Sequence, residues 1–263
     1  MNNNFVLGPN PLGILQSRGI GDIIIALPIA DYYRDQGHTI YWPICSEFIS
    51  HFEHTVPWIN WIPVPTDRQG AFFYDTPVDY LQQLGVTDCI CLYQALSGHP
   101  EFSARPEFQI QSFDQYKYSV AGVPFLKKWQ LSNCITRQLD RELQLKQSVT
   151  DGRPYVVTHL IGSDHVCDLD IAHLIPTDWQ IVPVTAHTDC IMDWITTLQH
   201  AEAIVAVDSV VANLVDQLGI AQQVDSYFIP RSHIQLSPVL GWDWTILEPS
   251  ESIRQRISIF TNR

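Results

Sequence analysis

The segment SRGIGD contains two glycines, Gly19 and Gly21, directly before a carboxylate, Asp22. The preceding run, 12–15, is short and apolar, as a buried strand is, whereas residues 22–35 carry apolar side chains at helical spacing. The glycines therefore lie in a predicted turn between a strand and a helix, with Asp22 at the start of the helix. Such turns are where open α/β sheets bind ligands. Asp22 is either a base facing a ligand there, or a plain helix cap.

The second candidate segment, AVDSVVANLVDQLG, has the same arrangement of apolar run, polar turn and helical pattern. Asp208 and Ser209 follow the apolar run 203–207 and precede a helix with apolar residues at 211, 214, 215 and 218. The unpaired N–H groups at the start of such a helix attract anions. Ser209 either caps these groups or binds a phosphate, and Asp208 is either part of the same site or an ordinary N-cap.

Two further polar segments contain residues that can bind an anion or a metal ion. In IPRSH, Arg231 follows a strand-like run and is either a phosphate ligand or an ordinary surface arginine. The segment 162–179 is rich in His, Cys and Asp, but its spacing matches no zinc signature, so we predict no metal site. Its potential ligands are His165, Cys167, Asp168, Asp170 and His173.

Alternating strand-like and helix-like patterns surround these segments. The alternation predicts βαβ units and two parallel sheets, separated by the turn-rich segment TDGRP at 150–154. Strands are predicted at 12–16, 38–44, 58–64, 87–93, 154–161, 180–185, 203–207 and 227–229, with helices at 22–35, 46–53, 77–84, within 109–149, at 190–200, at 211–218 and from Ser250 to about 260. We therefore expect two Rossmann-like lobes, 1–150 and 151–263, that face a central cleft.

Composition limits the classes of protein and partner. The 263 residues are 46% hydrophobic and 16% charged, which indicates a folded chain. The net charge of −13 disfavours nucleic acid as a partner. The Lys and Arg residues near the end of the first lobe either form a local basic groove or, as the better explanation, a solvated helix face; they are Lys127, Lys128, Arg137, Arg141 and Lys146.

The cysteines and the amino-terminal segment indicate in which cellular compartment the protein is expected. The six cysteines form no C-x-x-C pair, and Cys89 and Cys91 are expected on one face of a strand as reduced thiols. The sequence shows no secretory leader and no apolar run of about 18 residues that would span a membrane. We therefore expect a cytoplasmic protein.

The two candidate segments resemble the signatures of a known family. RGIGDIIIALPIADYYRDQGHTIYW resembles the opening of the heptosyltransferases of glycosyltransferase family 9, in which Gly-Asp precedes Leu-Pro and a helix. LQHAEAIVAVDSVVANLVDQLG is similar to the second signature of that family, a strand followed by D-[ST]-G and a His. The resemblance covers about 45 residues at each site and the order of elements between them.

The resemblance implies a fold, an activity and roles for individual residues. The fold is GT-B, with the acceptor bound by residues 1–150 and the nucleotide-sugar by 151–263. Asp22 would be the general base that takes the proton of the attacking hydroxyl in an inverting transfer, and the helix N-terminus would favour its ionised form. Gly19 and Gly21 would let the acceptor approach the backbone. No bound metal or other cofactor is implied.

The donor site carried over from the family contains Asp208 and Ser209 and departs from the pattern at two positions. Val210 replaces the usual Gly, and Asn213 replaces the usual His. The family's basic residue between the first two strands of this lobe is also missing, since 162–179 contains no Lys or Arg. The charge of the leaving group would then be met by helix N–H groups or by Arg18, Arg231 or His165.

Three other functions compete with a glycosyltransferase. Because the donor motif departs from the pattern, one alternative is a GT-B-shaped protein that binds a sugar nucleotide or a partner without catalysis. A dinucleotide-dependent oxidoreductase is another, but Ile24 stands where G-x-G-x-x-G requires its third glycine, and Glu47 is one position late for the ribose ligand. A glycosyltransferase that modifies DNA is allowed by the fold and opposed by the acidic charge.

Overall fold

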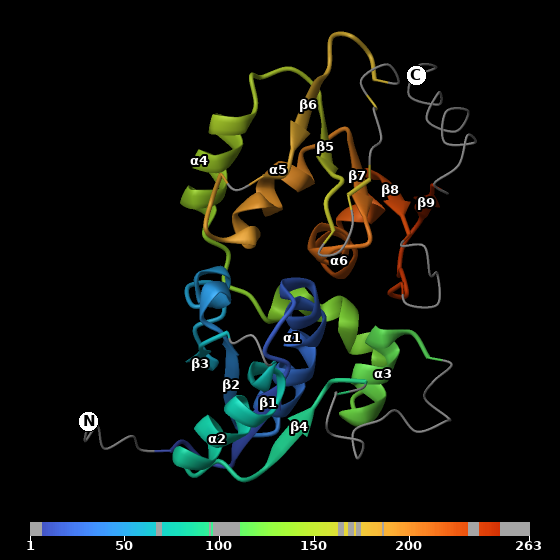
Figure 1. The fold of residues 1–263 in the computed structure, drawn as a ribbon. Helices are drawn as coiled ribbons and strands as arrows, with labels where there is room; N and C mark the ends of the chain where they lie inside the picture. The colour runs from blue at the N-terminus through green and yellow to red at the C-terminus, as the bar shows by residue number, and fades with distance from the viewer. Residues whose placement is uncertain are drawn as a thin grey trace. The chain divides into compact units, whose positions relative to one another are not determined.

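The computed structural model describes residues 7–66, 70–94, 96, 111–162, 166–167, 171, 175–185, 187–230 and 237–247. The chain divides into two compact units, Met1–Thr136 and Arg137–Arg263. Each unit contains its own sheet with helices around it (Figure 1). None of the helices in the described ranges is both long and apolar enough to cross a membrane.

The first unit has a four-stranded sheet in which every pair of neighbours is parallel. The order is β3-β2-β1-β4. The chain therefore adds β2 and β3 on one side of β1 and then adds β4 on the other side of β1. The strands are β1 (Pro11–Leu15), β2 (Thr39–Cys45), β3 (Asn60–Val64) and β4 (Cys89–Cys91).

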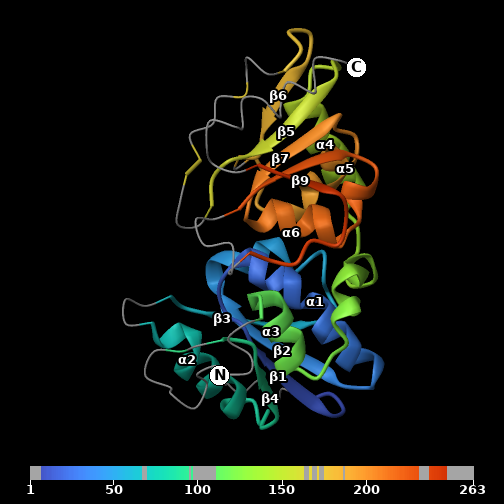
Figure 2. The same ribbon diagram turned by 90° about the vertical axis from the view of Figure 1, so that its right-hand side faces the viewer.

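Helices cover both faces of this sheet, which explains why its central strands are apolar throughout. On one face, Leu81 of α2 packs with Leu15 and Tyr41. On the other face lies α1, with α3 beside it (Figure 2). The elements between the strands are α1 (Ile20–Asp35), η1 (Ser46–His51), η2 (Ala71–Phe73), α2 (Asp75–Gln83), α3 (Phe113–Val120) and η5 (Phe125–Asn133).

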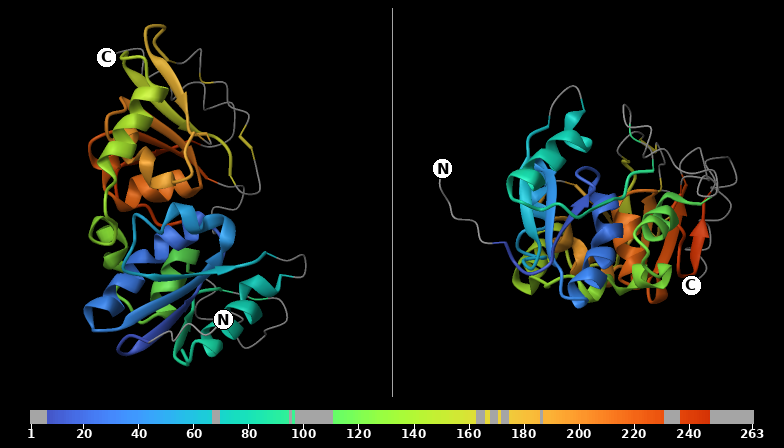
Figure 3. Two further views of the ribbon diagram at one scale, coloured as in Figure 1. Left: turned by 90° about the vertical axis from the view of Figure 1, so that its left-hand side faces the viewer. Right: turned by 90° about the horizontal axis from the view of Figure 1, so that it is seen from below.

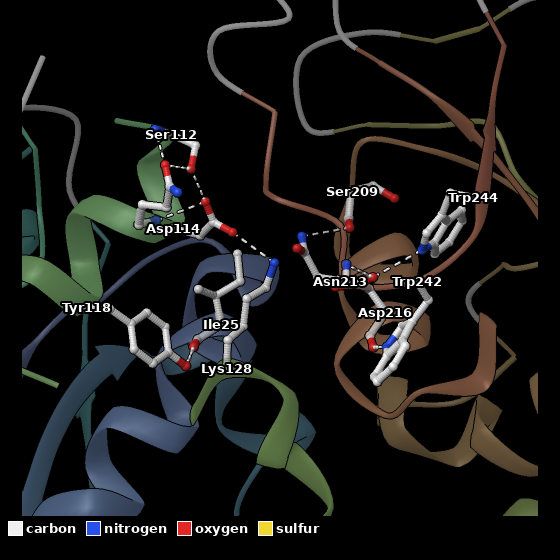
Figure 4. Close-up of polar contacts among 12 residues, drawn as sticks. Ile25, Ser112, Asp114, Tyr118, Lys128, Ser209, Asn213, Asp216, Trp242 and Trp244 are labelled. Atoms are coloured by element: carbon white, nitrogen blue, oxygen red, sulfur yellow. Dashed lines mark hydrogen bonds and ion pairs between the residues drawn. The ribbon is translucent and has the colours of Figure 1, made fainter. Parts of the chain in front are cut away.

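A buried ion pair joins α3 to η5 beside α1. Lys128 Nζ lies 2.8 Å from Asp114 Oδ2, and neither side chain is exposed to solvent. Asp114 also accepts hydrogen bonds from the Ser112 hydroxyl and from the backbone N–H of Gln115 (Figure 4). The carboxylate therefore has several partners, as a buried charge requires.

The second unit contains a five-stranded sheet, also parallel at every pairing, in the order β6-β5-β7-β8-β9. Its apolar cluster covers one face, while α5 and α6 belong to the other. The elements are β5 (Tyr155–His159), β6 (Gln180–Pro183), η7 (Ile191–Trp194), α5 (Ile195–Gln199), β7 (Ala203–Val207), α6 (Val210–Gln217), η8 (Ile220–Gln222), β8 (Asp225–Ile229) and β9 (Trp244–Ile246).

Helix α4 (Leu139–Val149) belongs to the second unit and packs on α5 and η7 (Figure 3). Glu142, which is 1% exposed, accepts bonds from the N–H and the hydroxyl of Thr196 and from Arg137. Arg141 pairs with Asp193 at 2.8 Å. The boundary between the units therefore precedes α4 at residues 136/137, rather than following it at 150 as the sequence suggested.

Strand β9 is fixed by a buried carboxylate on α6. Asp216, which has no exposed surface, accepts hydrogen bonds at Oδ1 from the Gly241 N–H at 2.9 Å and the Trp244 Nε1–H at 3.1 Å. Its backbone carbonyl accepts the Trp242 Nε1–H at 2.6 Å (Figure 4). These bonds hold the segment that leads into β9. This strand has only three residues, and the sequence pattern did not predict it.

The predicted mixed α/β architecture with two parallel sheets is confirmed. The predicted solvated helix face is wrong for Lys128, which is buried, and Arg137 and Arg141 are held in ion pairs within their own unit. The reason is that each of these side chains packs against a buried carboxylate, namely Asp114, Glu142 or Asp193. The predicted helix starting at Ser250 lies outside the described residues.

The buried pair gives a prediction about stability. Lys128→Met leaves the Asp114 carboxylate buried without its counter-charge, so we expect the free energy of unfolding to fall by about 3–5 kcal/mol. Adding Asp114→Asn to that variant removes the stranded charge and should recover part of the loss. Urea unfolding measures both values. A double variant less stable than Lys128→Met alone would contradict this explanation.

Candidate functional site

Both candidate segments lie at the point where the strand order of their sheet reverses. In the first unit the reversal falls between β1 and β4, and in the second between β5 and β7. Ligands of open parallel sheets bind beyond the carboxyl ends of the strands at such a point. SRGIGD follows β1, and Asp208 and Ser209 follow β7. The topology therefore supports both segments as binding sites, each within its own unit.

The turn after β1 requires a glycine at position 19. Gly19 has φ +84°, in the region that side chains disfavour, and a Cβ there would lie 2.5 Å from Asp22 Oδ2. Gly21 is within α1 and has no positive φ. The Asp22 carboxylate thus lies against the backbone of Gly19. The sequence placed both glycines in the turn, but Gly21 belongs to the helix.

Asp22 is partly exposed and paired with a buried lysine. Its side chain is 38% exposed, and Oδ1 lies 3.1 Å from Lys117 Nζ. Lys117, from α3, is 4% exposed and also donates to Gln16 Oε1 at 2.6 Å and to the Leu92 carbonyl at 3.3 Å. The lysine therefore joins the ends of β1 and β4 to the first turn of α1, and it fixes one oxygen of the carboxylate.

A tyrosine after β4 holds the same turn. The Tyr93 hydroxyl accepts hydrogen bonds from the backbone N–H of Ser17 at 2.8 Å and of Arg18 at 3.3 Å. Burial raises the pKa of Tyr93 well above its usual value, so the hydroxyl remains neutral. Arg18 itself is exposed, with its guanidinium 5.2 Å from the centre of the Phe72 ring.

The second site is built on a hydrogen bond between His159 and Ser209. Ser209 is the N-cap residue of α6, but its hydroxyl makes no capping bond and instead lies 2.8 Å from His159 Nδ1. His159 ends β5, on the sheet face that carries α5 and α6. Burial lowers the pKa of His159 to about 4, so the imidazole is neutral near pH 7.

Asn213, one turn further along α6, lies beside Ser209 and forms a polar cluster with Ser209 and His159. Its Nδ2 donates to the Ser209 carbonyl at 3.0 Å, so the side chain runs toward the helix N-terminus (Figure 4). Its Oδ1 is buried and has no hydrogen-bond partner in the described part of the chain. Asp208 is only 2% exposed, and the N-cap is Ser209, so the interpretation of Asp208 as a plain N-cap is wrong.

Several predicted residues lie outside the described part of the chain. They are Arg231, His165, Asp168, Asp170 and His173. Of the possible metal ligands named above for 162–179, only Cys167 is described, and it forms no disulfide.

Sequence reasoning missed Lys117 and His159. Nothing near Lys117 in the sequence marks it, because its partners come from segments about 25 to 100 residues away. The sequence did contain a signal for His159, because this residue lies at the end of an apolar strand-like run. Asp208, which was singled out, directly follows another such run.

A separate polar cavity of about 660 Å³ lies on the second unit, at the opposite ends of the strands from Ser209. Asp225, Ser226 and Trp242 line it, at the amino ends of β8 and β9. Because ligands of parallel sheets bind at the carboxyl ends, this cavity is not the site that the topology indicates.

Two doubly wound parallel units, each with a polar turn at its switch point, define the GT-B fold. Solved structures share it. One is a glycosyl transferase family 9 protein from Veillonella parvula, with TM-score 0.62, 11% identity and coverage of 96% of this chain and 90% of that chain. Another is the E. coli ADP-heptose lipopolysaccharide heptosyltransferase II, with TM-score 0.63, 11% identity and coverage of 96% and 97%.

The E. coli heptosyltransferase WaaC, solved with ADP, is similar at TM-score 0.52 and 11% identity, covering 95% of this chain and 98% of that chain. No family model matches the sequence. No curated protein matches it either. The likeness therefore lies in the fold.

The contact between Gly19 and Asp22 gives a matched test. A Cβ added at Gly37, where φ is +89°, would have no atom within 4 Å, whereas one added at Gly19, where φ is +84°, would lie 2.5 Å from Asp22 Oδ2. Both Ala substitutions should cost about 1–3 kcal/mol of backbone strain. Gly19→Ala must also displace the carboxylate, so we expect it to lower the melting temperature more than Gly37→Ala. Equal losses would show that Gly19 is needed for its backbone conformation alone.

Proposed function

We propose that this protein transfers a sugar from a nucleotide-sugar to a hydroxyl acceptor with inversion at the anomeric carbon. The observation that carries the proposal is a partly exposed carboxylate, Asp22, fixed by a buried lysine at the switch point of one unit of a GT-B fold. We assign the acceptor to the unit that contains Asp22 and the donor to the unit that contains Ser209.

Asp22 would act as the general base. Inversion requires a group that removes the proton of the attacking hydroxyl as the nucleotide diphosphate leaves the opposite face of the sugar. Lys117 holds Oδ1, so Oδ2, which lies over Gly19, is the oxygen that we assign to proton removal. This chemistry uses no bound metal ion.

The donor diphosphate would bind at the N-terminus of α6. The helix is eight residues long, and its first N–H groups and positive dipole end favour an anion. Ser209 contributes a hydroxyl whose orientation is set by His159. Asn213 contributes a carbonyl oxygen that accepts a hydrogen bond from a donor hydroxyl.

Asp22→Asn tests the assignment of the base. The amide keeps the size of the side chain and a hydrogen-bonding oxygen but cannot accept the proton, so we expect transfer to fall about 10²- to 10⁴-fold. Nucleotide release is measured with ADP-, UDP-, GDP- and CMP-sugars and saccharide acceptors, after a thermal-shift screen for binding. Asp35→Asn, at the exposed end of the same helix, is the control. Full activity in Asp22→Asn would show that Asp22 is structural.

Ser209→Ala tests the donor site. The variant removes the hydroxyl from the α6 N-terminus, so we expect about three- to tenfold weaker binding of the nucleotide-sugar in calorimetry, as expected for a lost hydrogen bond of ~1 kcal/mol. Ser148→Ala on α4, where the hydroxyl bonds the Leu145 carbonyl, is the matched control. Unchanged affinity in Ser209→Ala would place the donor elsewhere.

A second candidate is a protein that binds a sugar nucleotide without transferring it. The observation that favours it is Val210, whose side chain stands at the first position of α6, where the resembling family has glycine. Val210→Gly discriminates the two functions. If the protein binds but does not transfer, and Val210→Gly creates or strongly raises transfer, the natural chain is a binding protein.

A further inference from the structure

Among the described residues, those at the end of the second sheet where the donor would bind carry little positive charge. The described residues that follow its strands are 160–162, 184–185, 208–209, 230 and 247, and none of them is Lys or Arg. A diphosphate brings at least two negative charges, and the carboxylate of Asp208 opposes them. In this described part, His159 is the one side chain at the strand ends that can take up a proton and become a cation.

Two independent observations indicate a ligand site beside His159. Its Nδ1 bonds Ser209 at 2.8 Å, which brings the imidazole to the N-terminus of an eight-residue helix. The Oδ1 of Asn213, a side chain 4% exposed, is buried there without a partner among the described residues. A buried acceptor without a donor costs about 1–3 kcal/mol, which a ligand hydroxyl relieves. The cluster thus offers sites for an anion and for a hydroxyl, as in a sugar diphosphate.

We propose that His159 supplies a positive charge to the diphosphate of a nucleotide-sugar, and that it takes up one proton from solvent when the diphosphate binds. The inference rests on the proposed function and goes beyond it, because it makes donor binding dependent on pH. In this step an N–H bond forms on the imidazole and the bond to that proton in water or the buffer acid breaks, whereas no bond of the nucleotide-sugar changes. The proton comes from water or buffer and returns when the nucleotide leaves.

The charged surroundings of His159 are few in the described part of the chain. Asp208 follows β7, the strand paired with β5, and Asp216 is at the far end of α6, bonded to Trp244. Cys167 lies in the segment after β5, where its N–H bonds the Leu160 carbonyl. Neither β6 nor α5 carries a charged residue. Burial therefore dominates the protonation of free His159, and an arriving diphosphate changes that balance in favour of the charged form.

The direction in which nucleotide-sugar affinity changes with pH follows from the pKa of His159 in the free and in the bound protein. The free imidazole has a pKa of about 4 and is neutral at pH 5–8, whereas the diphosphate raises that pKa in the complex. Over the range where only the bound form is protonated, each unit of pH decrease strengthens binding up to tenfold. Below the pKa of the free protein the gain ends, because both forms then carry the proton.

Isothermal titration calorimetry with ADP-glucose and UDP-glucose tests the proposal. Both phosphates are esterified in these probes, so they do not titrate between pH 5 and 8. Heats measured at each pH in two buffers that hold that pH and differ in ionisation enthalpy, such as acetate and MES near pH 5.5, give the number of protons exchanged. We expect uptake that approaches one proton toward pH 5.5, together with a Kd that falls as the pH falls.

His159→Asn is the decisive variant, because its amide can still bond Ser209 but does not titrate. We expect weaker binding, no proton uptake and no pH dependence between pH 5 and 8. His200→Asn, at an exposed histidine bonded to the Thr196 carbonyl, is the control and should behave as the natural protein. If His159→Asn fails to fold, NMR titration of the His159 ring in the natural protein, with and without ADP-glucose, measures the same pKa change directly.

The outcomes separate this inference from the proposed function. Binding without proton uptake, or uptake that persists in His159→Asn, overturns the role of His159 and leaves the transferase proposal standing. If ADP-, UDP- and GDP-sugars all fail to bind at any pH from 5 to 8, both proposals are overturned.

Discussion

The parallel alignment of every strand pair is the constraint on which the rest of this structure depends. Parallel neighbours need crossover connections, which place helices on the faces of a sheet, and the central strands β1, β2 and β7 are therefore mostly apolar. The polar residues of both candidate segments come directly after such strands. Where the strand order reverses, two crossovers leave in opposite directions, and the ends of two adjacent strands remain accessible to a ligand.

The two units use this opening in electrostatically different ways. At the β1/β4 end, the buried Lys117 already has partners within the protein, namely a carboxylate, an amide oxygen and a backbone carbonyl. The charge is thereby balanced without a ligand. At the β5/β7 end, His159 is neutral and its neighbour is a hydroxyl. The first arrangement suits a fixed base, and the second suits a charge that arrives and leaves with its ligand.

Buried polar contacts also define which elements belong together. Glu142 joins α4 to α5, Asp216 joins α6 to the segment before β9, and Asp114 joins α3 to η5. Each carboxylate would be costly to bury without its partners, so each bond fixes one arrangement of otherwise apolar surfaces. This explains why the unit boundary precedes α4, even though the turn-forming residues in the sequence come after it.

The sequence by itself determined the element types, the two parallel sheets and the two polar turns, because hydrophobic periodicity and glycine placement are local properties. The conformational need for Gly19 and the position of Asp22 at the helix start belong to this part. Tertiary structure alone decided the partners of those residues. Lys117 reaches Asp22, and His159 reaches Ser209, through contacts between segments distant in sequence. Such contacts depend on strand order, and strand order arises from the packing of whole βαβ units, which no local pattern encodes.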